Sequence, residues 1–220
     1  MAYVLNIDTA IDNGSVCISN DDQLMNIESN ENQKELAAWI QPAIKQVTTL
    51  SGLTLKDINA IAVSIGPGSY TGLRIGLSTA KGLCYALKIP LIAIGTLDMM
   101  AAAAVQKDCD LICPMIDARR MEVYTALYKK NLEKIIFPSA ILLDSNLFEG
   151  ELEKNRILFF GNGSNKFKYL TNHDNASFDE IEINSSLLIK LSNKRLRELD
   201  FNSLAYTEPM YLKNFYVRGK

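Results

Sequence analysis

The sequence is poor in the side chains that bind transition metals. Its 220 residues include one histidine, His173, and four cysteines. Cys109 and Cys113 form a C-x3-C pair, one residue wider than the C-x2-C pairs of zinc sites, and no second pair follows. Four cysteines in a chain of this length do not indicate a disulfide framework either. We therefore expect no metal, no cofactor and reduced thiols, as in a cytoplasmic protein.

The sequence also lacks a strong excess of charge and a long apolar run. The net charge is −2, which is not the basic footprint of a protein that binds nucleic acid by itself. No apolar stretch approaches the roughly 18 residues of a membrane span, and the N-terminus does not resemble a signal peptide. A hydrophobic content of 48% suits one large domain or two small ones. If the protein acts on RNA, we expect a partner to supply most of the binding.

Glycine, in contrast, is concentrated in one run. Residues 64–76 read Ser-Ile-Gly-Pro-Gly-Ser-Tyr-Thr-Gly-Leu-Arg-Ile-Gly, between an apolar stretch and an amphipathic helix. Such a loop is either an anion-binding cradle or a tight turn that brings the helix close to its neighbours. Its spacing matches neither G-x-x-x-x-G-K-[ST] nor G-x-G-x-x-G, which disfavours P-loop and dinucleotide-binding sites. The residues of this candidate loop site are Gly66, Gly68, Ser69, Thr71, Gly72 and Arg74.

Hydrophobic periodicity divides the first half of the chain into strands and helices. The predicted strands are 2–8, 14–19, 24–27, 60–65 and 91–94, and the predicted helices are about 33–50, 71–87 and 97–105. Pro42 lies inside the first of these helices and should kink it.

The same pattern then begins again. Residues 111–117 are apolar and end in Asp117, as residues 2–8 end in Asp8, and this alignment places the strand at 14–19 on 123–128. A further strand is predicted at 157–160 and a further helix at 186–199. We expect an α/β protein of two related lobes, 1–106 and 107–220, each a mixed sheet flanked by helices, with a cleft between them.

Lobes that open with a strand, a terminal aspartate and a hairpin resemble the actin, sugar-kinase and heat-shock ATPase (ASKHA) superfamily. Those proteins place a glycine two residues after the aspartate to admit phosphate, and here the positions hold Ala10 and Arg119. The resemblance implies a degenerate nucleotide cleft and argues against an efficient ATPase. Its candidate residues are Asp8, Asp117, Gly161 and Gly163.

The helix at 71–87 has two stripes of apolar and small residues. The core stripe is Leu73, Leu77, Ala80, Cys84 and Leu87, and the second stripe is Ile75, Thr79, Gly82 and Ala86. The second stripe fits either a covered face inside the protein or a subunit interface, because small residues allow close approach of two helices. Ala37 and Ile44 flank the core stripe of the helix at 33–50 and could meet it. The hypothesis of a pairing surface therefore comprises Ala37, Ile44, Ile75, Thr79, Gly82 and Ala86.

Four segments stand in the order found in the bacterial TsaB family, also called YeaZ. They are Ile7–Thr9, Gly66–Arg74, Ile116–Arg119 with Glu122–Tyr124, and Pro209–Leu212. The chain resembles this family over nearly its whole length, and the glycine run is the most specific of the four. The family is a partner subunit in making threonylcarbamoyladenosine beside the tRNA anticodon, and its members look like degenerate copies of the catalytic subunit TsaD.

This resemblance implies a non-catalytic dimerization and activating subunit in the cytoplasm. The implied partners are a TsaD-type catalytic subunit, a TsaE-type ATPase in the same complex and, when the chain is alone, a second copy of itself. It also implies contact with tRNA only indirectly and none with a membrane.

The resemblance further implies the scaffold subunit and not the transferase. TsaD carries a metal-binding His-x3-His on the helix that follows the strand at 91–94, where this chain has Thr96 and Met100, and neither side chain is a ligand of iron or zinc. The family often has His-Ser-Glu before its first long helix, whereas this chain has Gln33-Lys34-Glu35. This chain has no histidine at that position, so any role of the histidine in the family is in question here.

Other functions would use the same residues. In an ASKHA-type small-molecule kinase or ATPase, Asp8 would organise magnesium, and the loops at Gly66 and Gly161 would hold phosphates. The missing glycines count against that function. A metalloprotease has almost no support, since the chain lacks H-E-x-x-H. Asp8 and Asp117 could be a general acid/base pair or strand-end carboxylates that cap backbone amides, of which we favour the second.

Overall fold

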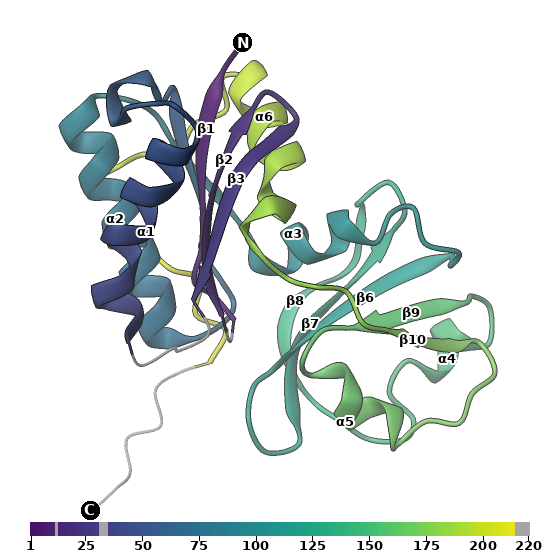
Figure 1. Cartoon of the computed structure of the whole chain (residues 1–220). Coiled ribbons are helices and arrows are strands. Elements are labelled where there is room, and N and C mark those ends of the chain that lie inside the picture. Colours follow the sequence, from purple (N-terminus) through teal and green to yellow (C-terminus); the bar gives the residue numbers. More distant parts are fainter. Residues whose placement is uncertain (12, 31–34, 214–220) are drawn as a thin grey trace, which may run out of the picture. The chain divides into compact units, whose positions relative to one another are not determined.

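The chain forms two compact units, each built around one five-stranded sheet (Figure 1). The computed structural model describes residues 1–11, 13–30 and 35–213. Unit 1 contains residues 1–103 and 182–209, and unit 2 contains residues 104–181 together with the described residues from 210 on.

The sheet of unit 1 is mixed and has the order β3-β2-β1-β4-β5. Its strands are β1 (Tyr3–Asp8), β2 (Gly14–Asn20), β3 (Gln23–Asn30), β4 (Ala60–Ser64) and β5 (Leu91–Ile94). β2 is antiparallel to β1 and β3, whereas β4 is parallel to β1 and β5. All five strands are predicted from the sequence, and β5 has the predicted bounds.

Helices cover both faces of this sheet (Figure 1). On one face lie α1 (Leu36–Leu50) and α2 (Tyr70–Leu87), and on the other lie the 3-10 helix η3 (Ser185–Leu188) and α6 (Ile189–Arg197). The short η2 (Leu55–Asp57) precedes β4, and α3 (Thr96–Ala103) follows β5.

Alternation along β1 explains the two covered faces. Leu5 and Ile7 belong to the hydrophobic cluster that includes residues of α1 and α2. Asn6, between them, points to the opposite face, where its Oδ1 accepts a hydrogen bond of 2.8 Å from Ser192 of α6. Successive side chains of a strand point to opposite faces, so this sheet presents an apolar side to α1 and α2 and a partly polar side to α6.

The structure differs from the expected lobes 1–106 and 107–220 at residues 182–209, which pack with unit 1. The backbone N–H of Ser185 donates to Ser15 Oγ of β2 at 2.7 Å, and Asn193 Nδ2 donates to the Asp21 carbonyl. Further along, the Asn202 N–H donates to the Leu91 carbonyl at 2.9 Å. These long-range hydrogen bonds leave no trace in local sequence periodicity.

The sheet of unit 2 has the order β8-β7-β6-β9-β10. Its strands are β6 (Leu111–Asp117), β7 (Glu122–Lys129), β8 (Lys134–Leu142), β9 (Ile157–Phe160) and β10 (Ala176–Asp179), and its helices are α4 (Glu149–Leu152) and α5 (Ser164–Lys168). The core contains packed aromatic rings, with the centroids of Phe159 and Phe167 4.9 Å apart and those of Phe159 and Phe178 5.4 Å apart.

The two sheets share one topology, which confirms the predicted duplication. β6 pairs with β7 and β9 in the directions in which β1 pairs with β2 and β4, and the edge strands β8 and β10 correspond to β3 and β5. The expected fold class, two related lobes with mixed sheets, is therefore correct. No helix of the described residues is long and apolar enough to cross a membrane.

Candidate functional site at Asp8 and the glycine loop

Asp8 ends β1 as a fully buried carboxyl group. Its Oδ1 accepts hydrogen bonds from Ser64 Oγ at 2.5 Å and from the Ala10 N–H at 3.1 Å. Its Oδ2 has no hydrogen-bond partner among the described residues. Burial raises the pKa of Asp8, and the hydrogen bonds from Ser64 and the backbone offset this only in part. The fold thus raises the pKa of Asp8 above the usual value of an aspartate.

The glycine loop packs directly on the two residues that follow Asp8. A Cβ added to Gly68 would lie 2.1 Å from the Ala10 carbonyl oxygen, and one added to Gly72 would lie 2.0 Å from the Thr9 carbonyl oxygen. A Cβ at Gly76 would lie 2.1 Å from Thr9 Oγ1, which itself donates to the Gly72 carbonyl at 2.8 Å. Any larger residue at these positions would push the helix away.

Three backbone donors at the start of α2 are used within the chain. The Ser69 N–H donates to the Ala10 carbonyl at 2.7 Å. Ser69 Oγ caps the helix by accepting from the Gly72 N–H at 3.2 Å, and the Ser69 carbonyl accepts from the Leu73 N–H at 2.8 Å. Of the two alternatives for this loop, its geometry is that of a tight turn with close helix packing.

The loop is also joined to the start of α3. The Thr96 N–H donates to the Gly66 carbonyl at 2.8 Å, and the Gly66 N–H donates to Thr96 Oγ1 at 3.1 Å. Met100 is fully buried one turn further along α3. Where a metal-binding helix would carry histidines, this chain therefore has a threonine that fixes the loop and a methionine that fills the core.

The remaining loop residues reach the surface. Thr71 is exposed, and the Arg74 guanidinium carbon lies 3.9 Å from the centre of the Tyr70 ring. This stacking holds the arginine along α2.

Asp117, the counterpart of Asp8 in unit 2, has a different environment. Its Oδ1 accepts from the Arg119 N–H at 2.6 Å and from Lys166 Nζ at 2.5 Å. Partial burial raises the pKa of Asp117, but the Lys166 ammonium and the Arg119 N–H outweigh this effect, so that the pKa lies below its usual value. Asp8 and Asp117 each accept a hydrogen bond from the backbone N–H two residues further along the chain. Each carboxylate therefore caps a backbone amide at the end of its strand.

The second glycine turn is packed in a similar way. A Cβ at Gly163 would lie 2.9 Å from the carbonyl carbon of Ile116 and 3.0 Å from the Asp117 nitrogen. Gly161 has a φ of 95°, which favours glycine. Asn162 Oδ1, between them, accepts from the Asp117 N–H at 2.8 Å. This asparagine was missed in the sequence, since only the glycines beside it form a recognisable turn signal.

Five of the six residues in the hypothesis of a pairing surface are accessible to some degree. Ala37, Gly82 and Ala86 are exposed, and Ile75 and Thr79 are half-buried. Ile44 is 2% exposed and belongs to the core of unit 1, because it lies four residues after Ile40 on the core side of α1. Tyr85, which no sequence motif singles out, is 80% exposed on α2.

The described residues contain no group of three or more histidine, cysteine or acidic side chains that could hold a metal. All four cysteines are buried and unpaired. Burial raises the pKa of Cys17, Cys84 and Cys113 to about 12 each, so these thiols remain protonated at neutral pH. Gln33 and Lys34 lie outside the described residues.

Together, the fold and site define a class: an ASKHA-like protein with two copies of one sheet and a glycine loop closed on its own aspartate turn. A structural relative of this class is YeaZ from Pseudomonas aeruginosa, with a TM-score of 0.79, 21% identity and coverage of 96% of this chain and all of that one. A more distant one is the activator of the 2-hydroxyisocaproyl-CoA dehydratase from Clostridium difficile with bound ADPNP. It has a TM-score of 0.52 and 9% identity, over 91% of this chain and 99% of that one.

Sequence comparison gives the family. Residues 26–207 match the family model described as TsaD, tRNA N6-adenosine threonylcarbamoyltransferase. The tRNA threonylcarbamoyladenosine biosynthesis protein TsaB of Escherichia coli is 40% identical over 58% of this chain and 55% of its own length. TsaB of Bacillus subtilis is 36% identical over 63% of this chain and 61% of its own length. The chain thus spans a little over half the length of these relatives. It belongs to the TsaB family, also called YeaZ, which is related to TsaD.

Proposed function

We propose that this protein is a non-catalytic, activating subunit in the synthesis of threonylcarbamoyladenosine on tRNA, acting through a TsaD-type catalytic subunit. A TsaE-type ATPase would belong to the same complex. The curated relatives named above are threonylcarbamoyladenosine biosynthesis proteins, and the finer assignment to a non-catalytic role rests on the chemistry of the site.

The observation that carries this proposal is the closed glycine loop. A Cβ has no room at Gly68 or Gly72, because it would lie 2.1 Å from the carbonyl oxygen of Ala10 or 2.0 Å from that of Thr9. An anion on that side of the loop would face these carbonyl oxygens, which repel negative charge. The loop that would hold phosphates in a kinase or ATPase is therefore used here to pack α2 on β1.

The aspartates support the same proposal. Magnesium binding needs an ionised carboxylate, but burial raises the pKa of Asp8. Asp117 is ionised, and its Oδ1 is paired with Lys166. The neighbour with bound ADPNP shares the fold at 9% identity, which gives this chain no nucleotide site by itself.

The pairing surface is the part of the proposal that explains how such a chain could act. We define it as Ala37, Ile75, Thr79, Gly82 and Ala86, with Ile44 left out because it is buried. A Cβ added to Gly82 meets nothing within 4 Å, so this part of α2 can receive another helix closely. The partner would be the catalytic subunit or, in its absence, a second copy of this chain.

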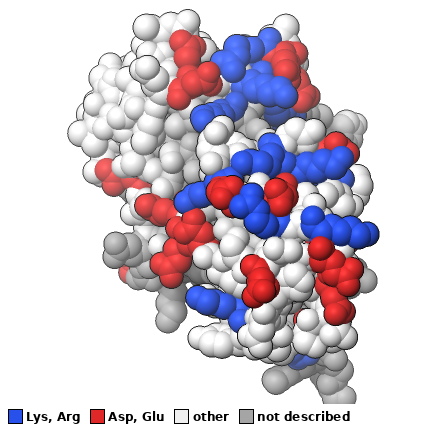
Figure 2. Space-filling model, turned by 90° about the vertical axis from the view of Figure 1, so that its right-hand side faces the viewer, with Lys and Arg blue, Asp and Glu red and all other residues white. Residues whose placement is uncertain are grey.

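Charge supports an indirect role toward tRNA. On the face shown in Figure 2, lysine and arginine side chains are interleaved with acidic ones. The net charge of −2 supplies no overall excess of positive charge, and phosphate contacts dominate nucleic-acid affinity. The isolated chain should therefore bind tRNA weakly.

Reconstitution tests the proposal. The chain is co-purified with the TsaD-type protein of the same cell, and tRNA modification is assayed with and without the chain. We expect a stable complex and a strong stimulation of modification, while the isolated chain hydrolyses neither ATP nor peptides. A robust ATP turnover by the isolated chain that Asp8→Ala abolishes would instead establish a kinase or ATPase.

A further inference from the structure

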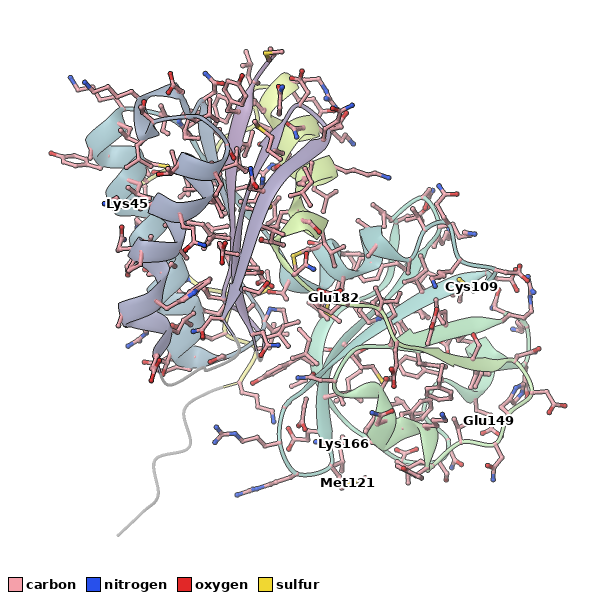
Figure 3. The ribbon with its side chains drawn as sticks, viewed as in Figure 1. Lys45, Cys109, Met121, Glu149, Lys166 and Glu182 are labelled. Atoms are coloured by element: carbon pink, nitrogen blue, oxygen red, sulfur yellow. The ribbon has the colours of Figure 1, made fainter. Side chains whose placement is uncertain are left out.

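Four buried polar side chains gather where η3 meets the sheet of unit 1. Each is at most 1% exposed, and they are Asp8, Ser15, Ser64 and Ser185. We call them the polar cluster. η3 follows Glu182, which is labelled in Figure 3 and begins the stretch that rejoins unit 1. Because η3 contacts β1, β2 and β4, the polar cluster joins this stretch to three strands of the sheet.

Strand register and hydrogen bonds bring the polar cluster together. Asp8 of β1 pairs directly with Ser15 of β2, and side chains opposite each other in neighbouring strands lie on the same face. Ser64 Oγ donates to Asp8 Oδ1 at 2.5 Å, and the Ser185 N–H donates to Ser15 Oγ at 2.7 Å. Asn6, two residues before Asp8, bonds to α6. The polar cluster therefore lies on the face that η3 and α6 cover.

Two oxygens of the polar cluster lack a partner. Asp8 Oδ2 and Ser185 Oγ are buried and make no hydrogen bond among the described residues, where the one other such side-chain atom is Asn20 Oδ1 at the far end of β2. The Ser185 hydroxyl partly offsets the burial that raises the pKa of Cys17 to about 12, but a thiol bonds only weakly. Buried polar atoms are rarely left unpaired, and ordered water is a common partner.

We propose that one internal water molecule bridges Asp8 Oδ2 and Ser185 Oγ and fastens η3 to β1. Water donates and accepts, so it can bond to a hydroxyl and to a carboxyl group in either protonation state. Asp8 is the one acidic member of the polar cluster, and the described residues contain no group of three or more histidine, cysteine or acidic side chains that could hold a metal. The donor set thus favours water over a cation.

The bridge gives Asp8 a positioning role that needs no chemistry. Asp8 Oδ1 also accepts from the Ala10 N–H, and the Ala10 carbonyl accepts from the Ser69 N–H of the glycine loop. The water would therefore connect residues 182–209 to the turn on which the glycine loop packs. This inference concerns unit 1 alone and does not depend on the proposed function.

A high-resolution crystal structure of the parent chain and of Ser185→Ala tests the bridge directly. We expect a solvent peak about 2.5–3.0 Å from both oxygens in the parent and its loss in the variant. A direct hydrogen bond between the two oxygens with no solvent peak would overturn the proposal, as would a peak that persists unchanged in Ser185→Ala. Crystals soaked in a rubidium salt separate water from a monovalent cation: an anomalous peak at this position would also overturn it.

Hydrogen exchange measures whether the bridge holds η3 in solution. Ser185→Ala removes one partner of the water and keeps the backbone bond to Ser15, so amides of η3 and the start of α6 should exchange about tenfold faster. The matched control is Ser186→Ala. Its hydroxyl bonds to Asn184 Oδ1, outside the polar cluster, and Asn184 keeps the Ser186 N–H, so exchange should change much less.

Equal acceleration in both serine variants would mean a general weakening of η3 and would overturn the fastening role. Unchanged exchange in Ser185→Ala would overturn it as well. If Ser185→Ala does not fold, the solvent peak of the parent and the rubidium soak still decide whether water occupies the site.

Discussion

At the scale of single residues, two glycines of α2 have different surroundings and different roles. Gly72 of α2 touches the Thr9 carbonyl, whereas Gly82, ten residues along the same helix, borders open space. The first is needed for close packing inside unit 1, and the second leaves a flat place on the surface. The same residue type therefore gives opposite mutational outcomes.

We predict that Gly72→Ala destabilises the protein and Gly82→Ala stabilises it. The added methyl at Gly72 must push apart α2 and the Thr9–Ala10 turn, and overpacking costs about 1–3 kcal/mol. At Gly82 it meets nothing, and replacing a glycine in a helix interior gains about 0.5–1 kcal/mol. Urea denaturation of both variants measures the difference. Equal effects at the two positions would show that the loop is not closed on Thr9.

Asp8 gives a prediction about pH. A buried carboxyl whose pKa is raised in the folded state binds its proton more tightly than in the unfolded chain. Its contribution to stability is fully present below the unfolded pKa, about 3.9, and is lost as pH rises through the folded pKa. Asp8→Asn cannot ionise and escapes this loss. The melting temperature of the variant relative to the parent should therefore increase from pH 4 to pH 7. A constant or decreasing difference would mean that Asp8 is ionised in the fold.

At the scale of elements, α2 has one side for its own unit and one side available to another molecule. Leu73, Leu77, Ala80 and Cys84 are buried, as their spacing predicts. Gly82, Tyr85 and Ala86 are exposed, and the open space at Gly82 allows a second helix to approach closely.

Substitutions on the exposed side should therefore affect pairing and not folding. We predict that Gly82→Leu and Ala86→Glu weaken association with the catalytic subunit and with a second copy, while the thermal melt of each variant stays at or above that of the parent. The bulky leucine blocks close approach, and the glutamate would be buried without a partner. Mass by light scattering, alone and with the partner, is the readout. Normal pairing together with lowered melts would place this stripe in the internal core.

The elements also show what local sequence reveals. β5, β6 and β9 have the predicted bounds, because their apolar runs are short and bordered by turn residues. The duplication implies a third strand in the second lobe, but the sequence does not predict the bounds of β8. Pro138 interrupts its run, and proline is confined to edge strands such as this one. β10 was missed because it is four residues long and mostly polar. Ile44 is predicted to lie on the pairing surface, but it is buried, since its i, i+4 spacing from Ile40 places it with the core.

At the scale of the whole molecule, the duplication was readable from two aspartates that end apolar strands, and the shared sheet topology confirms it. The return of residues 182–209 to unit 1 could not be read, since Asn193 and Asn202 contact residues more than a hundred positions away. The close packing of the glycine loop on Thr9 and Ala10 is of the same kind: the sequence showed the glycines but not which backbone they approach.

The same separation of roles should hold in the assembled complex. Unit 1 carries a closed loop beside Asp8 and, on α2, a surface suited to another helix. If the protein works by pairing, the carboxyl group of Asp8 can be replaced without loss of function, whereas the exposed side of α2 cannot be changed without loss. Asp8→Asn and Ala86→Glu are a matched pair for this purpose, each a single substitution in unit 1.

The most direct measurement is the amount of threonylcarbamoyladenosine formed on tRNA by the catalytic subunit with the parent chain, with Asp8→Asn, with Ala86→Glu, and with no added chain. If the chain acts only by pairing with the catalytic subunit, Asp8→Asn should stimulate modification as the parent does. Ala86→Glu should give no more product than the reaction without the chain. The contrary result, full stimulation by Ala86→Glu and none by a folded Asp8→Asn, would show that this subunit contributes chemistry of its own.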